Sequence, residues 1–247
     1  MARVPDLERY CAVHGLKMVT VADVIAYRRR HERLVERVVQ MDLPTRFGSF
    51  DAIGYRSIVD GKHHVAIVRG DVRGAEDVLV RVHSECPTRD LLGSLLCDCG
   101  LQLEHPLRRI EEEGRGVVLC LAREARGIGL LNRLNAHRLQ EHDIDGVEAS
   151  LEPGYAADLR DYRIGTEILD DLGLGSVRLL TNNPSKVAGF ERSGLRVTGR
   201  VAIEQPPCDD IRDYLRTKAS RRGHALHRDD VDLGDDGRVH LELVAEA

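Results

Sequence analysis

Three cysteines in the middle of the chain have the spacing of a metal-binding site. Cys97 and Cys99 are separated by one residue, and ten residues separate Cys86 from Cys97. A Cys-x-Cys pair brings two sulfurs together on one loop, and a third thiolate can close on the same ion at about 2.3 Å. Three protein ligands leave the fourth position of a zinc ion open, as in catalytic sites. Zinc in such a site lowers the pKa of a bound water toward about 7 and so supplies hydroxide at neutral pH.

The same cysteines also fit a structural zinc site. In that alternative, His83 or a more distant histidine closes the coordination as the fourth ligand. The other three cysteines are scattered along the chain and are interpreted as free thiols: Cys11, Cys120 and Cys208. Clustered cysteines in a cytosolic chain indicate metal binding or catalysis more often than disulfides.

Composition narrows the class of protein. The chain has 247 residues, of which 42% are hydrophobic and 31% charged, as is typical of a soluble globular protein. The net charge of −5 argues against a nucleic-acid-binding protein, so local Arg and Lys would have to meet any phosphate. Since there is no long apolar run and no hydrophobic signal segment, we expect a cytoplasmic protein with no membrane partner.

Strands and helices are expected to alternate around the cysteines. Strands are predicted over 50–59, 64–68, 78–82, 116–121 and 177–180. Helices are predicted over 101–113, 130–142 and 158–172, and after the turn at 182–186. This alternation predicts an α/β protein with mixed sheets and flanking helices.

The first 40 residues show a different pattern. Apolar residues recur there at three- and four-residue steps with Arg and Glu between them, which predicts helix. Residues 43–45, which include Pro44, are interpreted as a short linker before the strands begin.

Several motifs, taken in order, resemble the GTP cyclohydrolase II family. They are residues 83–86, 97–103, 111–116, 127–132, 158–162, 179–187 and 214–218. The resemblance runs from about residue 42 to residue 226 and implies the GTP cyclohydrolase II-like α/β fold. It implies a zinc-dependent homodimer that hydrolyses GTP at guanine C8, opens the imidazole ring and releases pyrophosphate, giving formate and a diaminopyrimidine ribosyl phosphate.

A second resemblance covers the N-terminal residues. Residues 1–7, 14–16 and 26–29 are similar to the end of dihydroxybutanone-phosphate synthase. The acidic catalytic segment of that family is not among them, so we expect its activity to be absent. The implied domains are a helical remnant over 1–41, a catalytic domain over 42–226 and an acidic tail over 227–247.

The family resemblance also implies roles for individual residues. The zinc ligands are Cys86, Cys97 and Cys99. The nucleotide contacts are Arg81, His83, Ser84, Glu85, Gln102, Glu124, Arg126, Thr181 and Lys186. GTP or a related purine nucleotide is the implied ligand, with Mg²⁺ as a candidate cofactor on its triphosphate. The turn before Lys186 suits a phosphate because helix N-termini favour anions.

Asp158 and Arg160 align with residues that the family uses for proton transfer and for attack at the α-phosphate. Because a guanidinium is protonated at any working pH, charge stabilisation by Arg160, held by Asp158, is the preferred role. Structural roles are the alternatives for these positions. Asp158 and Arg160 would form a structural ion pair, Glu85 would orient the metal ligands, and Gln102 would cap its helix.

The chain departs from the family pattern at several motif positions. Ala125 replaces a glycine of the nucleotide loop, Leu96 replaces an arginine, and His137 replaces the active-site tyrosine. Tyrosine titrates near pH 10 and histidine near pH 6.5, so His137 offers a different acid–base group. This predicts either the ordinary riboflavin-pathway enzyme or a specialised paralogue that stops at the formamidopyrimidine nucleotide. The alternative is a non-catalytic zinc- and nucleotide-binding protein.

Overall fold

The computed structural model describes residues 2–21, 23–24, 27–28, 32–122, 131, 134–135, 138 and 162–203. The chain divides into two compact units, Met1–Leu34 and Val35–Ala247. The first contains α1 (Val4–His14), which starts at a proline in its first turn and ends at Gly15 with φ of 63°. No residue of α1 is buried. None of the helices in the described residues is long and apolar enough to cross a membrane.

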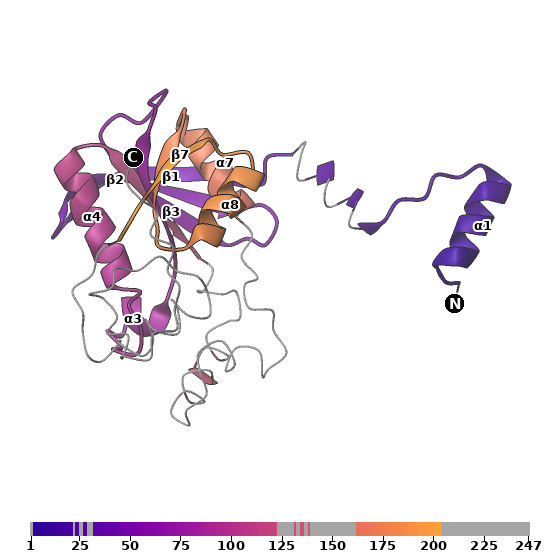
Figure 1. The fold of residues 1–247 in the computed structure, drawn as a ribbon, viewed down its shortest axis with the longest axis horizontal. Coiled ribbons are helices and arrows are strands. Elements are labelled where there is room, and N and C mark those ends of the chain that lie inside the picture. The colour runs from indigo at the N-terminus through magenta and orange to yellow at the C-terminus, as the bar shows by residue number, and fades with distance from the viewer. Residues whose placement is uncertain are drawn as a thin grey trace, which may run out of the picture. The chain divides into compact units, whose positions relative to one another are not determined.

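In the described residues of the second unit, seven strands form one mixed sheet (Figure 1). The strands are β1 (Val35–Thr45), β2 (Gly48–Ser57), β3 (His63–Arg69), β4 (Val78–Ser84), β5 (Gly116–Leu121), β6 (Val177–Leu180) and β7 (Val197–Val201). Their order across the sheet is β1-β2-β3-β5-β4-β6-β7. The pairs from β1 to β5 are antiparallel, and β5, β4, β6 and β7 run parallel. The mixed α/β architecture expected from the sequence is therefore confirmed.

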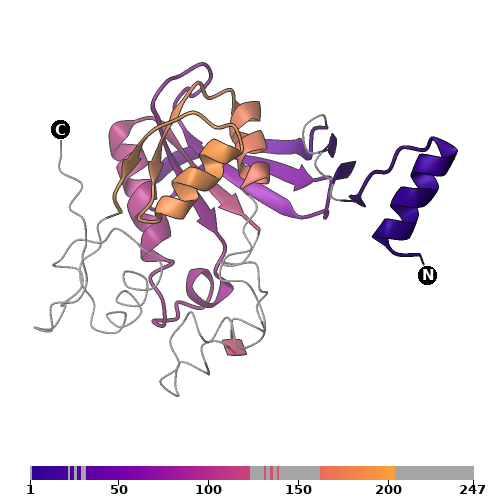
Figure 2. The ribbon, with the colours of Figure 1, turned by 45° about the vertical axis from the view of Figure 1, so that its right-hand side comes forward.

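The helices lie on both faces of the sheet (Figure 2). They are α4 (Leu101–Glu113), α7 (Arg163–Leu172) and α8 (Pro184–Arg192), whereas the short helix α3 (Pro87–Asp90) follows the carboxyl end of β4. Val118 of β5 packs with Leu107 and Ile110 of α4. The next residue, Leu119, points the other way and lies close to Gly165 of α7, beside the α8 residue Phe190. Since successive strand residues face opposite sides, α4 covers one face and α7 and α8 cover the other.

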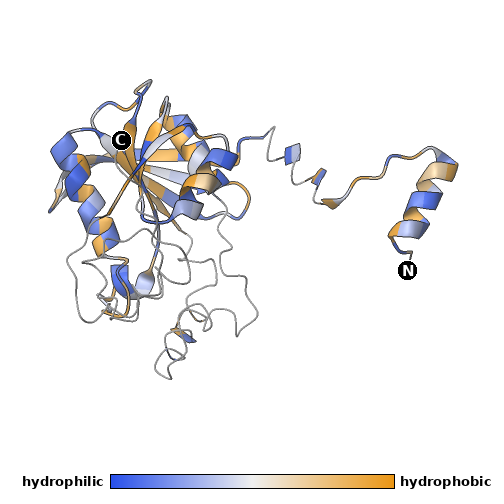
Figure 3. Cartoon of the chain, in the orientation of Figure 1, coloured by the Kyte–Doolittle hydropathy of each residue, from blue (hydrophilic) through white to orange (hydrophobic). Residues whose placement is uncertain are grey.

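Apolar residues concentrate along the central strands (Figure 3). On the α4 face, a core cluster joins buried residues from five elements and from the segment after β7: Phe50, Leu79, Leu107, Ile110, Val118, Leu180 and Ile203. Full burial of a side chain such as Ile110 stabilises the fold by about 1.5–3 kcal/mol. The helix lies so close to β5 that a Cβ atom on Gly116 would come within 2.9 Å of the Ile110 side chain. Glycine at this position therefore lets α4 approach the strand.

The connections that leave β4 and β6 diverge. The chain passes from β4 through α4 to β5 on one side, and from β6 through α8 to β7 on the other. The gap between the carboxyl ends of β4 and β6 is therefore a topological switch point, where open α/β sheets place their ligands.

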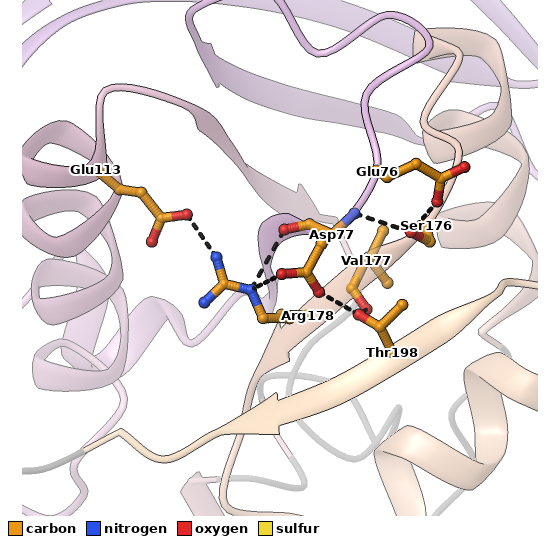
Figure 4. A network of polar contacts seen from close by, with 7 residues as sticks. All are labelled: Glu76, Asp77, Glu113, Ser176, Val177, Arg178 and Thr198. Atoms are coloured by element: carbon orange, nitrogen blue, oxygen red, sulfur yellow. Dashed lines mark hydrogen bonds and ion pairs between the residues drawn. The ribbon is translucent and has the colours of Figure 1, made fainter.

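A polar network holds the opposite ends of these strands together (Figure 4). Arg178 pairs with Asp77 at 2.7 Å and with Glu113 at 2.6 Å. Asp77 adopts a φ of 56° and its N–H donates to the Ser176 hydroxyl at 2.8 Å. Thr198 of β7 donates to the carbonyl oxygen of Val177 at 3.0 Å. The network fixes β4, β6 and β7 in register at the end away from the switch point.

The helix expected to continue through residues 35–39 is wrong. Residues 35–45 form β1, which pairs with β2 along its length, so the expected linker at 43–45 is the end of this strand. β1 is an edge strand whose residues after Val35 are mostly exposed, and its register shifts between Arg37 and Val39. An exposed, irregular strand shows no two-residue alternation of apolar side chains, and an edge strand tolerates Pro44. Residues 35–41 thus belong to the second compact unit, as part of the sheet.

Candidate metal centre and nucleotide site

The three predicted metal ligands meet at the carboxyl end of β4. Cys86 follows this strand, while Cys97 and Cys99 lie on the loop that enters α4. All three are buried, and their sulfur atoms lie within 4.8 Å of one another. The Sγ atoms of Cys86 and Cys97 are 3.7 Å apart. Two sulfurs on a tetrahedral zinc ion with bonds of 2.3 Å lie about 3.8 Å apart, whereas a disulfide bond is only about 2.0 Å long. The donor set fits zinc with one vertex left for another ligand.

The electrostatics of the cluster also call for a cation. Hydrogen bonding with Cys86 raises the pKa of the Cys97 thiol, while hydrogen bonding with Cys99 lowers it. Burial adds to the rise, because a thiolate without a counter-charge is poorly solvated there. Three adjacent thiolates become compatible when a metal ion neutralises them.

Groups around Cys86 hold it in place. The Thr88 hydroxyl lies 3.4 Å from the Cys86 sulfur, and the Cys86 N–H donates to Oδ2 of Asp90 at 2.8 Å. The same oxygen lies 2.8 Å from Nε2 of His83. Burial lowers the pKa of His83 and so favours the neutral ring, although the neighbouring Asp90 carboxylate acts in the opposite direction. Within the described residues, the group of potential metal ligands contains the three cysteines and not His83. The geometry therefore gives no support to His83 as a fourth ligand.

A buried arginine joins the two strands at the switch point. Arg81 of β4 is 4% exposed. Its Nη1 donates to the carbonyl oxygen of Leu180 in β6 at 3.0 Å, and its Nη2 donates to Oε1 of Gln102 at 2.8 Å. Lys186 of α8 makes a second link, because its Nζ donates to the carbonyl oxygen of Val82 at 2.8 Å. The predicted nucleotide contacts Arg81, Gln102 and Lys186 are thus parts of one packed region.

The turn before α8 is ordered by its own side chains. The Thr181 hydroxyl accepts from the Asn183 N–H at 3.1 Å, and Oδ1 of Asn183 accepts from the Ser185 N–H at 3.0 Å. The Lys186 N–H donates to the Asn183 carbonyl oxygen at 3.1 Å. These N–H groups are thus already used within the turn, and contact of Thr181 or Lys186 with a phosphate stays a prediction.

Ser84 and Glu85 complete the edge beside β5. Ser84 pairs in register with Leu121, and the Glu85 N–H donates to the Leu121 carbonyl oxygen at 3.2 Å. Glu85 is exposed, and partial desolvation of its carboxylate, with repulsion from Asp90, raises its pKa. An exposed carboxylate next to Cys86 can accept a hydrogen bond from a ligand that enters the site.

The family model that matches the sequence decides the identity of this arrangement. The model described as GTP cyclohydrolase II matches residues 36–202, which include all three cysteines and both sides of the switch point. The chain belongs to the GTP cyclohydrolase II family. The match begins one residue after the start of β1.

Two curated relatives are considerably longer than this chain. The chain is 55% identical over 227 residues to riboflavin biosynthesis protein RibBA of Bacillus mycoides, covering 92% of this chain and 57% of that protein. It is 54% identical to the same protein of Bacillus cereus strain B4264, with the same coverage. The chain therefore spans little more than half the length of these relatives.

A solved structure also matches. It is RibBX of A. baumannii, described as a two-domain 3,4-dihydroxy-2-butanone 4-phosphate synthase. It is 29% identical, the TM-score is 0.42, and the match covers 82% of this chain and 50% of that one.

In this member of the GTP cyclohydrolase II family, the structure brings ten of the predicted site residues to the region around the carboxyl ends of β4 and β6. They are Arg81, His83, Ser84, Glu85, Cys86, Cys97, Cys99, Gln102, Thr181 and Lys186. The other predicted residues lie outside the described part of the chain, and their roles stay predictions: Glu124, Arg126, His137, Asp158 and Arg160.

Sequence reasoning missed three polar residues around the cysteines. Thr88 and Asp90 contact Cys86, and Asp98 lies between Cys97 and Cys99 with 1% of its surface exposed. A signal was available for each, since polar residues one to four positions from a metal ligand are well placed to orient it.

Proposed function

We propose that this chain hydrolyses GTP at guanine C8, with ring opening and pyrophosphate release, as a zinc-dependent GTP cyclohydrolase II of riboflavin biosynthesis. The observation that carries the proposal is the buried three-cysteine cluster at the switch point, where two sulfurs already have the spacing of zinc ligands. The family match and the names of the relatives favour this hydrolysis over a non-catalytic zinc- and nucleotide-binding role.

Each group of residues in the site has its own proposed role. Cys86, Cys97 and Cys99 would hold the ion, and zinc in an open three-thiolate site supplies an activated water when bound. Lys186 and the Thr181 hydroxyl would contact phosphate oxygens, the lysine as a point charge. Glu85 would accept an N–H of the guanine or orient the attacking water.

The finer parts of the proposal concern residues and partners beyond the described site. Asp158 and Arg160 would stabilise charge at the α-phosphate, and Glu124 and Arg126 would contact base and triphosphate. Zinc at one ion per chain, Mg²⁺ on the triphosphate and a homodimer complete the proposal. A cytoplasmic location stays a prediction.

The extent of the reaction depends on His137, which stands where the family has a tyrosine. If His137 fails to support the second hydrolysis, the reaction ends at a formamidopyrimidine nucleotide and no formate appears. A His137→Tyr variant would then release formate, whereas in a complete enzyme the same substitution would leave the product unchanged.

The deciding experiment combines a zinc assay with product analysis. Purified protein is incubated with GTP, and the nucleotide product, formate and pyrophosphate are quantified by mass spectrometry and enzymatic assay. Formate in equal amount to a diaminopyrimidine product indicates the complete reaction. A formamidopyrimidine without formate indicates the shortened one. One zinc per chain with no turnover of GTP or related purine nucleotides would refute the proposed hydrolysis.

A further inference from the structure

Asp98 is a buried carboxylate that the proposed reaction does not use. It lies between two metal ligands, Cys97 and Cys99, and only 1% of its surface is exposed. A carboxylate at this depth destabilises the fold unless hydrogen bonds compensate for its lost hydration. We therefore expect hydrogen bonds to compensate the Asp98 carboxylate within the metal loop, the segment that carries Cys97, Asp98 and Cys99.

Gln102, in the first turn of α4, binds Asp98 at two points. The Gln102 side chain donates through Nε2 to Oδ2 of Asp98 at 2.6 Å, and its backbone N–H donates to the Asp98 carbonyl oxygen at 3.0 Å. The metal loop is thus attached to the start of α4 by a backbone and a side-chain hydrogen bond.

Arg81 determines which way the Gln102 amide faces. A guanidinium carries only donors, so the group 2.8 Å from its Nη2 must be the amide oxygen of Gln102. The amide nitrogen then faces Asp98, which accepts. Arg81 is itself fixed by the carbonyl oxygen of Leu180 at 3.0 Å. A continuous chain of hydrogen bonds therefore runs from β6 through Arg81 and Gln102 to the metal loop.

These hydrogen bonds indicate a different role for two of the predicted nucleotide contacts, Gln102 and Arg81. Gln102 was expected to contact the nucleotide, yet its oxygen and one N–H are already used within the protein. Arg81 was expected to contact the nucleotide as well, yet two of its nitrogens hold β6 and α4 together. Both residues are therefore well placed to act on the cysteines through Asp98.

We propose that Asp98 is a positioning residue of the metal centre, and that Arg81 and Gln102 set the geometry of Cys97 and Cys99 through it. The proposal rests on the zinc site of the proposed function but not on the reaction that the site performs. Hydrogen-bonding partners that orient metal ligands are typically worth 10–100-fold in metal affinity. Removal of the Asp98 carboxylate should therefore weaken zinc binding by about this factor.

The test compares metal binding across four single variants of the full chain. They are Asp98→Ala, Asp98→Asn, Gln102→Leu and, as a matched control on the same helix, Glu104→Gln, which breaks an exposed ion pair with Arg46. Zinc affinity is measured by competition with a chromophoric chelator, and the Co²⁺-substituted proteins are compared by visible absorption. Circular dichroism and thermal unfolding identify variants that fold.

We expect Asp98→Ala and Gln102→Leu each to weaken zinc binding about 10–100-fold and to change the Co²⁺ ligand-field bands. Asp98→Asn keeps an acceptor oxygen for Gln102 and should stay within about threefold of the parent, like Glu104→Gln. The double variant Asp98→Ala/Gln102→Leu should lose no more zinc affinity than the single variant with the larger loss, because both substitutions break the same series of hydrogen bonds.

Other outcomes would overturn the proposal. These are parental affinity and an unchanged Co²⁺ spectrum in a folded Asp98→Ala or Gln102→Leu protein, or an Asp98→Asn loss as large as that of Asp98→Ala. If Asp98→Ala does not fold, Gln102→Leu decides alone. Since these readouts do not involve GTP, a parent protein that binds zinc but turns over no GTP refutes the proposed function and leaves this test intact.

Discussion

The ammonium group of Lys186 donates a hydrogen bond to the carbonyl oxygen of Val82 at 2.8 Å. The contact joins the first turn of α8 to the carboxyl end of β4, and Val82 lies four residues before Cys86. Lys186 is 5% exposed, so its charge lies within the protein and close to the switch point. One side chain thus links the predicted phosphate turn with the strand that leads to the metal.

Replacement of Lys186 should affect nucleotide binding more than metal binding. Lys186→Met keeps most of the aliphatic length but removes the charge. Hydrogen bonds to charged groups contribute about 1.5–3 kcal/mol, so we expect KM for GTP to rise about 10–100-fold. Steady-state kinetics and zinc analysis on the same preparation check this. A large loss of zinc with unchanged KM would show that Lys186 serves the metal centre instead.

The described cysteines should differ in their reactivity toward iodoacetamide at pH 8. Burial, reinforced by Asp90 and Glu85, raises the pKa of the Cys120 thiol to about 12, so almost none of it is thiolate at that pH. In the zinc-loaded protein we expect Cys11 to be alkylated and Cys86, Cys97 and Cys99 to be protected by the metal. A chelator should expose these three but not Cys120.

Peptide mapping by mass spectrometry reads out each cysteine separately. Cys120 labelling should increase only as the pH approaches 12, since the thiolate is the reactive form. Rapid labelling of Cys120 at pH 8 would contradict the raised pKa of its thiol. Labelling of Cys86, Cys97 and Cys99 that does not depend on the chelator would contradict the expected metal site.

The sequence predicted the metal ligands because their signal is local. Cys86, Cys97 and Cys99 lie within 14 residues, and α4, β5 and β6 have the bounds predicted for them. The contacts that complete the site are not local. The Arg81–Gln102 bond spans 21 positions and the Lys186–Val82 bond spans 104. Such contacts depend on strand order, and periodicity does not reveal which strand lies next to β4.

β1 shows why another part of the fold escaped prediction. A strand is recognised by alternation between a buried and an exposed face. β1 lies at the edge of the sheet, is exposed on most of its length and has an irregular register, so its apolar residues follow no two-residue period. Its valines and charged residues matched a helical period instead, although tertiary pairing with β2 decides the structure.

Gly189 of α8 lies directly under the ring of Tyr162. A Cβ atom at this glycine would overlap the Cδ2 atom of Tyr162. The same ring packs against Phe190, with centroids 5.0 Å apart. Tyr162 precedes α7 and is the last residue of the 158–162 motif, which contains the predicted Asp158 and Arg160. The bare backbone of Gly189 therefore leaves room for the ring of Tyr162 just before α7.

Gly189→Ala should consequently destabilise the protein and slow the reaction. Overpacking typically costs about 1–3 kcal/mol, and the better helix propensity of alanine offsets roughly 1 kcal/mol of that. We expect a net loss of up to about 2 kcal/mol in urea unfolding, together with a lower kcat at unchanged zinc content. Gly199→Ala is the control, because its Cβ would meet only Arg178 at 3.9 Å.

A second substitution separates steric displacement of Tyr162 from a defect in α8 itself. On its own, Tyr162→Leu should lower the stability because it removes the packing against Phe190. It also removes the ring atoms that the methyl group of Gly189→Ala would strike. The double variant should therefore be less destabilised than the sum of the two single variants, by more than the 0.5 kcal/mol expected of independent sites. Strict additivity would mean that the methyl acts on α8 and not through Tyr162, and that Gly189 has no part in placing the Tyr162 ring.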